Sequence, residues 1–232
     1  MKKYVSFCLA LLLIFCFSSI AYADNELSSF ASSSGRYAEI ASMFFTKQYT
    51  LYGKTGNDIT SDVYDEITPL YESGRYEAVI EYLFQNIGYA EHITSETLPS
   101  TSGLNSSSDT IRVTRDFYQV VDDQEHGFQN HNAIFGTVVL TYVVNSNQGE
   151  IIRASLPNVT ARDLFHYYGD LEPRMSVTGR SASISSDNQS VTFSFTVSGT
   201  LEVQSEDIAP EINAFNLAYS YSADFSFTEY AE

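Results

Sequence analysis

From residue 110 onward, apolar and polar side chains alternate with a period of two, which predicts β-strands that each bury one face. The most regular stretch lies near the C-terminus, where one face of the predicted strand carries Leu217, Tyr219, Tyr221, Ala223, Phe225 and Phe227. We predict that this row faces a packed core and that the strand pairs in a sheet. Residues 133–145 are apolar on both faces, which predicts a central strand.

Turn-forming residues separate several of the predicted strands. The turn at 146–149 allows residues 150–156 to pair back on the central strand, and the turn at 186–189 joins 181–185 to 190–203. Antiparallel strands with one wet face are typical of a sandwich or of a strongly curved sheet. Between the two hairpins, residues 161–169 predict a short helical turn.

Residues 24–94 instead show apolar positions at the spacing of amphipathic helices. The sequence Ser-Gly-Arg-Tyr at 34–37 returns at 73–76, and the same pattern of apolar positions follows each copy. This internal repeat predicts helical hairpins with a glycine at the corner. The corner is similar to that of tetratricopeptide repeats, although the spacing of the copies departs from the 34 residues of that family. We expect a hairpin packed on a neighbouring element rather than a peptide-binding repeat.

Residues 95–109 separate the two regions and have a bias toward serine, glycine and proline. This composition is typical of a flexible linker or a long loop. The patterns together predict an α+β protein. It has N-terminal helical hairpins at 24–94 and a mainly antiparallel β-sheet or sandwich at 110–232.

The first 23 residues contain the three parts of a secretory signal peptide. A basic start with Lys2 and Lys3 precedes an apolar run at 5–17, and Ala21-Tyr22-Ala23 forms a cleavage site. The apolar run is shorter than the roughly 20 residues that a membrane-spanning helix needs. We therefore expect cleavage after Ala23 and a secreted or cell-surface protein. The alternative is an uncleaved N-terminal anchor.

Charge and cysteine content narrow the classes of partner and chemistry. The chain has 12 Lys and Arg against 29 Asp and Glu, a formal net charge of −17, and signal cleavage would remove two more positive charges. Binding to nucleic acid or to an anionic membrane needs a basic surface, so we expect a protein or a small ligand as partner. Cys8 and Cys16 both lie in the predicted signal, which leaves no disulfide or thiolate metal site and favours a bacterial source.

One segment gathers side chains that can bind metals. It lies between two predicted strands and contains Asp122, Asp123, Glu125, His126 and His131. The two histidines are candidate zinc ligands, and the three carboxylates are candidate calcium ligands. Because their spacing matches no established ligand signature, we expect a solvated polar loop and no bound cofactor.

The sequence contains no motif for a nucleophilic hydrolase, a phosphate-binding loop or a zinc protease. Strand tyrosines are expected in the core with their hydroxyls at its rim rather than on a sugar-binding platform, and these are Tyr118, Tyr142, Tyr219 and Tyr221. Two functions stay open. The first is an exported noncatalytic protein that binds a partner or ligand at the cell surface or outside the cell. The alternative is an extracellular hydrolase whose catalytic carboxylates are dispersed in sequence.

Overall fold

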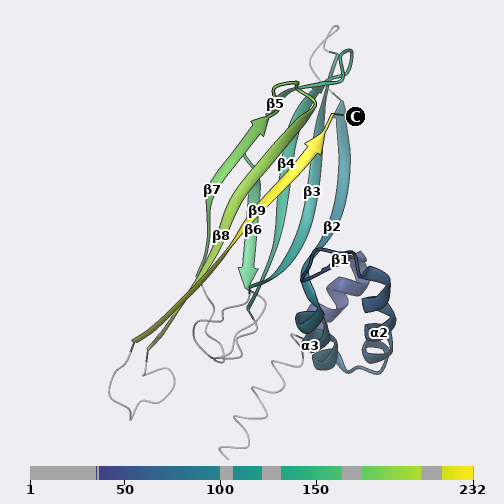
Figure 1. Cartoon of the computed structure of the whole chain (residues 1–232), viewed down its shortest axis with the longest axis vertical. Coiled ribbons are helices and arrows are strands. Elements are labelled where there is room, and N and C mark those ends of the chain that lie inside the picture. The colour runs from purple at the N-terminus through teal and green to yellow at the C-terminus, as the bar shows by residue number, and fades with distance from the viewer. Residues whose placement is uncertain are drawn as a thin grey trace, which may run out of the picture.

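A computed structural model describes residue 35 and residues 37–99, 107–121, 132–163, 174–204 and 216–231. In this part of the chain, two antiparallel sheets pack against each other and three helices lie at one end (Figure 1). The first helix covers 37–47, α2 covers Thr60–Glu72 and α3 covers Tyr76–Asn86. The predicted α+β class with mainly antiparallel strands is confirmed. None of the described helices has the length and apolar character needed to cross a membrane.

The larger sheet has the strand order β1-β2-β3-β4-β5, and β6 also pairs with β4. Strands β5 and β6 share the outer edge of β4, because β5 pairs with residues 142–145 and β6 pairs with residues 134–139. The central position predicted for residues 133–145 is therefore confirmed. The strands are β1 Thr50–Gly53, β2 Ile87–Pro99, β3 Ser108–Val121, β4 Asn132–Asn145, β5 Glu150–Ala154 and β6 Asn158–Asp163.

The smaller sheet has the order β7-β8-β9, with β7 Arg174–Ile184, β8 Ser190–Gln204 and β9 Asn216–Tyr230. Strand β9 pairs with β8 along its whole length, as predicted for the C-terminal strand. Tyr221, Phe225 and Phe227 are buried. The side chains of Leu217 and Tyr219 lie outside the described residues.

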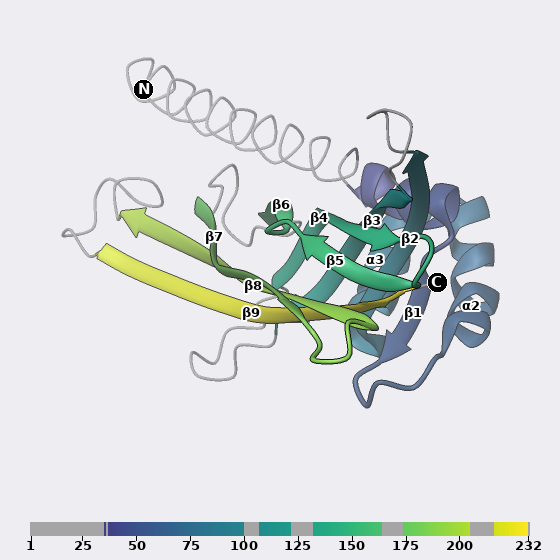
Figure 2. The ribbon, with the colours of Figure 1, turned by 90° about the horizontal axis from the view of Figure 1, so that it is seen from above.

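The two sheets enclose an aromatic core. The Phe117 ring of β3 lies 4.5 Å from Phe225 and 5.9 Å from Phe195, measured between ring centroids. Gly136 on β4 makes room for this packing, because a Cβ there would overlap the Phe117 ring and lie 2.6 Å from the backbone oxygen of Thr160. Seen from above, the smaller sheet lies across one face of the larger one (Figure 2).

The helices cover the opposite face of the larger sheet. Each copy of the internal repeat buries the same three positions, which are Ile40, Ala41 and Phe44 in the first copy and Val79, Ile80 and Leu83 in the second. These side chains form a second core with Tyr118 of β3 and with Ala133 and Phe135 of β4. Gly74, at the corner before α3, has φ +73, a conformation that favours glycine.

Several predicted boundaries are corrected by the strands. The helical region predicted to reach residue 94 contains β1 and ends at Asn86, and β2 occupies the first part of the linker predicted at 95–109. The serines and threonines of β2 resemble a linker in composition. They form a strand because they pair with β3 in register, up to Pro99 opposite Asp109. Strand β6 occupies the start of the helical turn predicted at 161–169. The predicted signal peptide at 1–23 lies outside the described residues.

Candidate ligand groove

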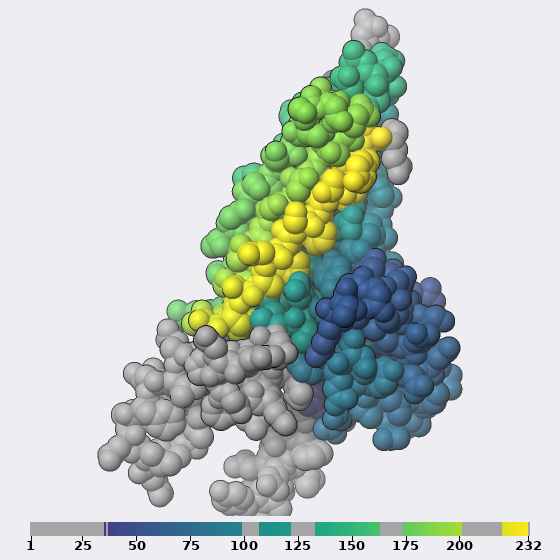
Figure 3. Space-filling view, in the orientation of Figure 1, coloured from purple at the N-terminus to yellow at the C-terminus, as the bar shows by residue number. Residues whose placement is uncertain are grey.

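An open groove of about 760 Å³ lies between β9 and the turn that follows β1. Residues 224–228 of β9 form one wall, and Gly53, Lys54 and Gly56 form the other. The floor carries side chains of β2 and β3, which are Tyr89, Glu91, Arg115 and Gln119. In Figure 3 the teal floor lies between yellow β9 and the dark blue turn.

The groove exists because the sandwich is closed on one side only. The β7 edge of the smaller sheet packs beside β5 and β6. At the other edge, β9 lies over β3, while β2 and β1 continue the larger sheet beyond it. Tyr89 and Glu91 of β2 therefore line the groove, and Tyr89 also packs against the sandwich core.

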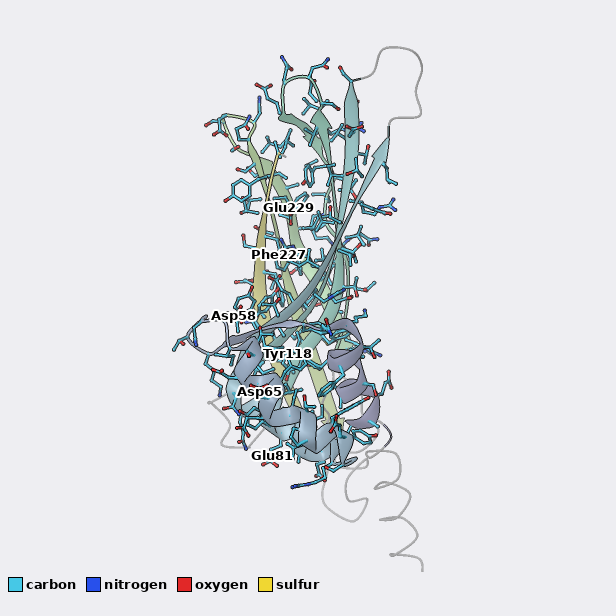
Figure 4. The ribbon with its side chains drawn as sticks, turned by 90° about the vertical axis from the view of Figure 1, so that its right-hand side faces the viewer. Asp58, Asp65, Glu81, Tyr118, Phe227 and Glu229 are labelled. Atoms are coloured by element: carbon cyan, nitrogen blue, oxygen red, sulfur yellow. The ribbon has the colours of Figure 1, made fainter. Side chains whose placement is uncertain are left out.

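The wall opposite β9 is fixed by a close approach and by hydrogen bonds. A Cβ at Gly88 would lie 3.0 Å from the Cα of Lys54, so glycine allows the turn to close on β2. Asp58 Oδ1 accepts bonds from the Thr60 backbone N–H at 2.9 Å and the Thr60 hydroxyl at 2.6 Å. These bonds lower the pKa of Asp58. Figure 4 shows Phe227 and Glu229 above the turn that carries Asp58.

A charge cluster on the floor links the two sheets. Arg115 Nη1 donates to Glu91 Oε2 at 2.8 Å, and Nη2 donates to Glu229 Oε1 at 2.7 Å. The guanidinium carbon also lies 5.0 Å from the Phe227 ring centroid, within cation–π range. All three charged side chains are only 13% exposed. Burial lowers the pKa of Arg115, but its bonds to Glu229 and Glu91 outweigh this effect and raise the pKa overall.

Two tyrosines complete the cluster. The Tyr89 hydroxyl donates to Glu91 Oε2 at 3.1 Å, and the Tyr52 hydroxyl donates to Oε1 at 3.4 Å. Their rings are stacked, with centroids 5.9 Å apart. Burial, and then the charge of Glu91, raises the pKa of both hydroxyls, so each stays protonated at neutral pH. Glu91 is therefore held by three donors.

The serine and threonine hydroxyl groups of the groove and the nearest described imidazole point away from one another. The Ser226 and Thr228 hydroxyls bond to Ser194 and Thr192 on the outer face of the smaller sheet. His92 of β2 lies on the helix side, with its ring 6.1 Å from that of Tyr49. No described serine or threonine of the groove is thus paired with a base. Within the described residues there is also no group of three or more His, Cys, Asp or Glu side chains that could hold a metal.

A second buried charge lies on the helix side of β3. Asp116 accepts bonds from Lys47 Nζ at 2.6 Å and from the Thr137 hydroxyl at 2.5 Å. The nearby Tyr49 hydroxyl is buried and has no hydrogen-bond partner among the described residues. Burial raises the pKa of this hydroxyl, and the charge of Asp116 raises it further. This cluster lies in the contact between the helices and the sheet, away from the groove.

The site residues predicted from the sequence do not form the groove. Asp122, Asp123, Glu125, His126 and His131 lie outside the described residues. Tyr118, Tyr142 and Tyr221 are buried, which agrees with the expected core position of the strand tyrosines.

The alternation of apolar and polar residues in β3 and β9 contains a signal for the charge cluster of the groove that the sequence-based prediction did not use. It places Arg115 between Val113 and Phe117 on a buried face, and Glu229 at the end of the row that contains Phe225. Opposite charges at core positions of two strands predict that they pair. Comparison of the chain with protein families, with curated proteins and with solved structures finds no match.

Proposed function

We propose that the chain is an exported, noncatalytic protein of bacterial type that binds a partner or ligand through the groove beside β9. The observation that carries this proposal is the state of Glu91, the floor carboxylate. It accepts bonds from Arg115, Tyr89 and Tyr52, so its oxygens are occupied by the protein itself. A carboxylate held in this way fixes the floor of a binding site and is poorly placed to exchange protons with a substrate.

The expected partner is a protein or a small ligand at the cell surface or outside the cell. The net charge of −17 opposes binding to nucleic acid and, after signal cleavage, to anionic membranes. We propose that the predicted N-terminal helical hairpins support the wall of the groove, since α2 follows directly on the turn that forms it. No bound cofactor is part of the proposal.

The hydrolase alternative needs two carboxylates that flank a substrate bond. Glu91 and Glu229 instead converge on one guanidinium. Another carboxylate of this region, Asp224, accepts a bond from Thr196 at 2.6 Å on the outer face of the smaller sheet. These contacts support binding over hydrolysis.

Fluorine NMR of protein labelled with 3-fluorotyrosine tests the binding function. Signals of Tyr52 and Tyr89, assigned with Tyr52→Phe and Tyr89→Phe, should shift saturably with members of a mixed oligosaccharide and peptide library. Mass spectrometry should recover those members unchanged. A library member that is cleaved by the wild type and left intact by Glu91→Gln would instead establish the hydrolase.

Export is tested separately by the mass of the mature chain. A bacterial host should release a protein that begins at Asp24, because signal peptidase cuts after the small residue of Ala-Tyr-Ala. Ala23→Leu should block this cleavage, whereas Asn25→Leu, beyond the cut, should leave it intact. Recovery of the mature, membrane-bound protein with Met1 still attached would contradict the proposal.

A further inference from the structure

We propose that an extended peptide with basic side chains binds in the groove by adding a strand to the open edge of β9. This inference deepens the proposed function and rests on it. Strand addition is an established mode of peptide recognition, in which backbone hydrogen bonds supply affinity and alternate side chains supply specificity.

The backbone of β9 points hydrogen-bonding groups into the groove. In an antiparallel pair, every second residue exchanges both of its backbone bonds with its partner strand. Ala231 N–H donates to Gln189 O at 2.8 Å, and the register of β8 and β9 runs without a shift from Tyr230 to Asn216. Odd-numbered residues of β9 therefore bond to β8. The backbone groups of Asp224, Ser226 and Thr228 point to the other side.

The β8 hairpin gives independent support for this orientation. Ser190 O accepts a bond from Ser185 N–H of the β7 side at 2.9 Å, so the Ser190 backbone faces away from β9. Its partner across the pair is Tyr230, an even-numbered residue. Among the described residues, no backbone bond to the N–H or C=O of Asp224, Ser226 or Thr228 comes from the groove side.

The shape of the groove matches one strand. Five consecutive residues of β9 line it, although consecutive side chains of a strand point to opposite faces. The groove therefore follows the backbone edge itself over about 17 Å, the length of five extended residues. The three outward-facing residues offer about six hydrogen bonds to an added strand.

The wall favours a single peptide over a second copy of this chain. A second copy would bring its whole smaller sheet to the edge, so further strands would lie beside the added one at about 4.8 Å spacing. The turn at Gly53, Lys54 and Gly56 faces β9 across the groove and occupies that side. Gly88 and the Asp58–Thr60 bonds hold this turn in place.

Charge selects a basic peptide. Glu91 and Asp224 line the groove together with Arg115 and Lys54, and the positive charge of Arg115 is paired with Glu229 as well as with Glu91. The chain as a whole carries a net charge of −17. The field of such a protein attracts a positively charged segment and repels an acidic one. Lysine or arginine side chains on the added strand can approach Asp224, which is exposed at the edge.

Fluorescence anisotropy with labelled peptides tests the proposal on the exported chain. The probes are acetylated peptides of alternating lysine and valine, of glutamate and valine, and of lysine and valine with every backbone nitrogen methylated. We expect saturable binding of the first peptide, and binding at least about tenfold weaker for the other two. N-methylation removes the peptide's donors without changing its charge, so equal binding of the methylated peptide would overturn strand addition.

Ser226→Pro tests the edge from the protein side. Proline at 226 removes an N–H that points into the groove and leaves the bonds between β8 and β9 intact. It should weaken binding of the lysine–valine peptide about tenfold, while the matched control Ser226→Ala should stay within about twofold. Equal binding by the two variants would overturn the proposal. The methylated peptide provides the same test on wild-type protein if the proline variant fails to fold.

The outcomes separate this inference from the function on which it rests. If library ligands shift Tyr52 and Tyr89 but none of the peptides binds saturably, the groove is a ligand site and strand addition is wrong. If no ligand reaches the groove, both fail. Concentration-dependent dimers that Ser226→Pro abolishes would assign the edge to a second copy and overturn the peptide assignment.

Discussion

The two faces of β3 each hold a buried charge, and they do so in different ways. Arg115 and Asp116 are neighbours in the chain, so their side chains point to opposite faces of the sheet. Arg115 joins β9 through Glu229, and Asp116 joins the helical end through Lys47. The three charged side chains of the sandwich-side cluster are each 13% exposed, whereas the Lys47 side chain is 41% exposed. One dipeptide thus connects the larger sheet to both layers.

Strand β4 also differs between the helical end and the rest of the sandwich, in how many of its residues are buried. Residues 133–136 are buried on both faces, because the helices cover one face there and the smaller sheet covers the other. Beyond them, every second residue from Val138 to Val144 is buried and the residues between are partly exposed. The helical end is therefore a second core on the same strands, and mutations can address the two cores separately.

Phe225→Ala should have the largest effect, and it should act on the sandwich. Phe225 is 4% exposed and packs on Phe117 and Phe195. The lost burial and the remaining cavity should lower the free energy of unfolding by about 3–5 kcal/mol. Ser226→Ala, on the wet face of the same strand, should change it little. Urea denaturation measures both, and equal values would contradict the assigned facing of β9.

Arg115→Met should have the second-largest effect, because it leaves Glu91 and Glu229 facing each other in a nearly buried place. We expect a loss of about 3 kcal/mol at neutral pH. Adding Glu91→Gln and Glu229→Gln should recover most of that loss, because the stranded charges are then gone. Thermal unfolding of the single and triple variants measures the recovery. A triple variant as unstable as the single one would show that the guanidinium acts through packing alone.

On the helix side, variants of Asp116 and of Lys47 should lose different amounts of stability. Asp116→Asn leaves Lys47 without its ion-pair partner, but Lys47 reaches water. This variant should lower the free energy of unfolding by about 1–2 kcal/mol. Lys47→Met leaves Asp116 without its ion-pair partner, and the Asp116 side chain is only 9% exposed. This variant should therefore lower the free energy of unfolding by more. Chemical denaturation of both variants ranks them. Equal losses would mean that Asp116 is better solvated than its burial indicates.

Alkaline pH should affect both faces through their tyrosines. Burial raises the pKa of Tyr89 and Tyr49 above the usual value of about 10, so the folded state holds protons that the unfolded state releases. The stabilisation is complete below about pH 10 and is lost as pH rises from there through the raised values. Tyr89→Phe should flatten this decline in the unfolding free energy.

Tyr49→Phe is the matched control, and it should have the smallest effect at neutral pH. The Tyr49 hydroxyl has no described partner, so its removal abandons no hydrogen bond and relieves a buried polar group. Tyr89→Phe gives up the bond to Glu91 and should be the less stable of the two. The reverse order in thermal unfolding would place a partner on Tyr49.

The sequence predicted a strand more successfully where one face is exposed to solvent than where the composition of the segment resembles a loop. The alternation from Tyr221 to Phe227 was sufficient to place β9, because only a packed core maintains such a row. Strand β2 was missed because Ser95, Glu96 and Thr97 have the composition of a linker. They become a strand only through pairing with β3, which is information held outside the segment. The groove was missed for a related reason, since Glu91 and Arg115 meet only after β2 is placed.

The bond between Arg115 and Glu229 joins residues that are 114 positions apart in the chain. Contacts between such distant residues form late, since the intervening chain must first be ordered, and proteins dominated by them fold in milliseconds to seconds. We therefore expect the sandwich to close slowly, after its hairpins have formed. For the export that we propose, a slow last step would keep the polypeptide extended long enough to be threaded through a secretion channel.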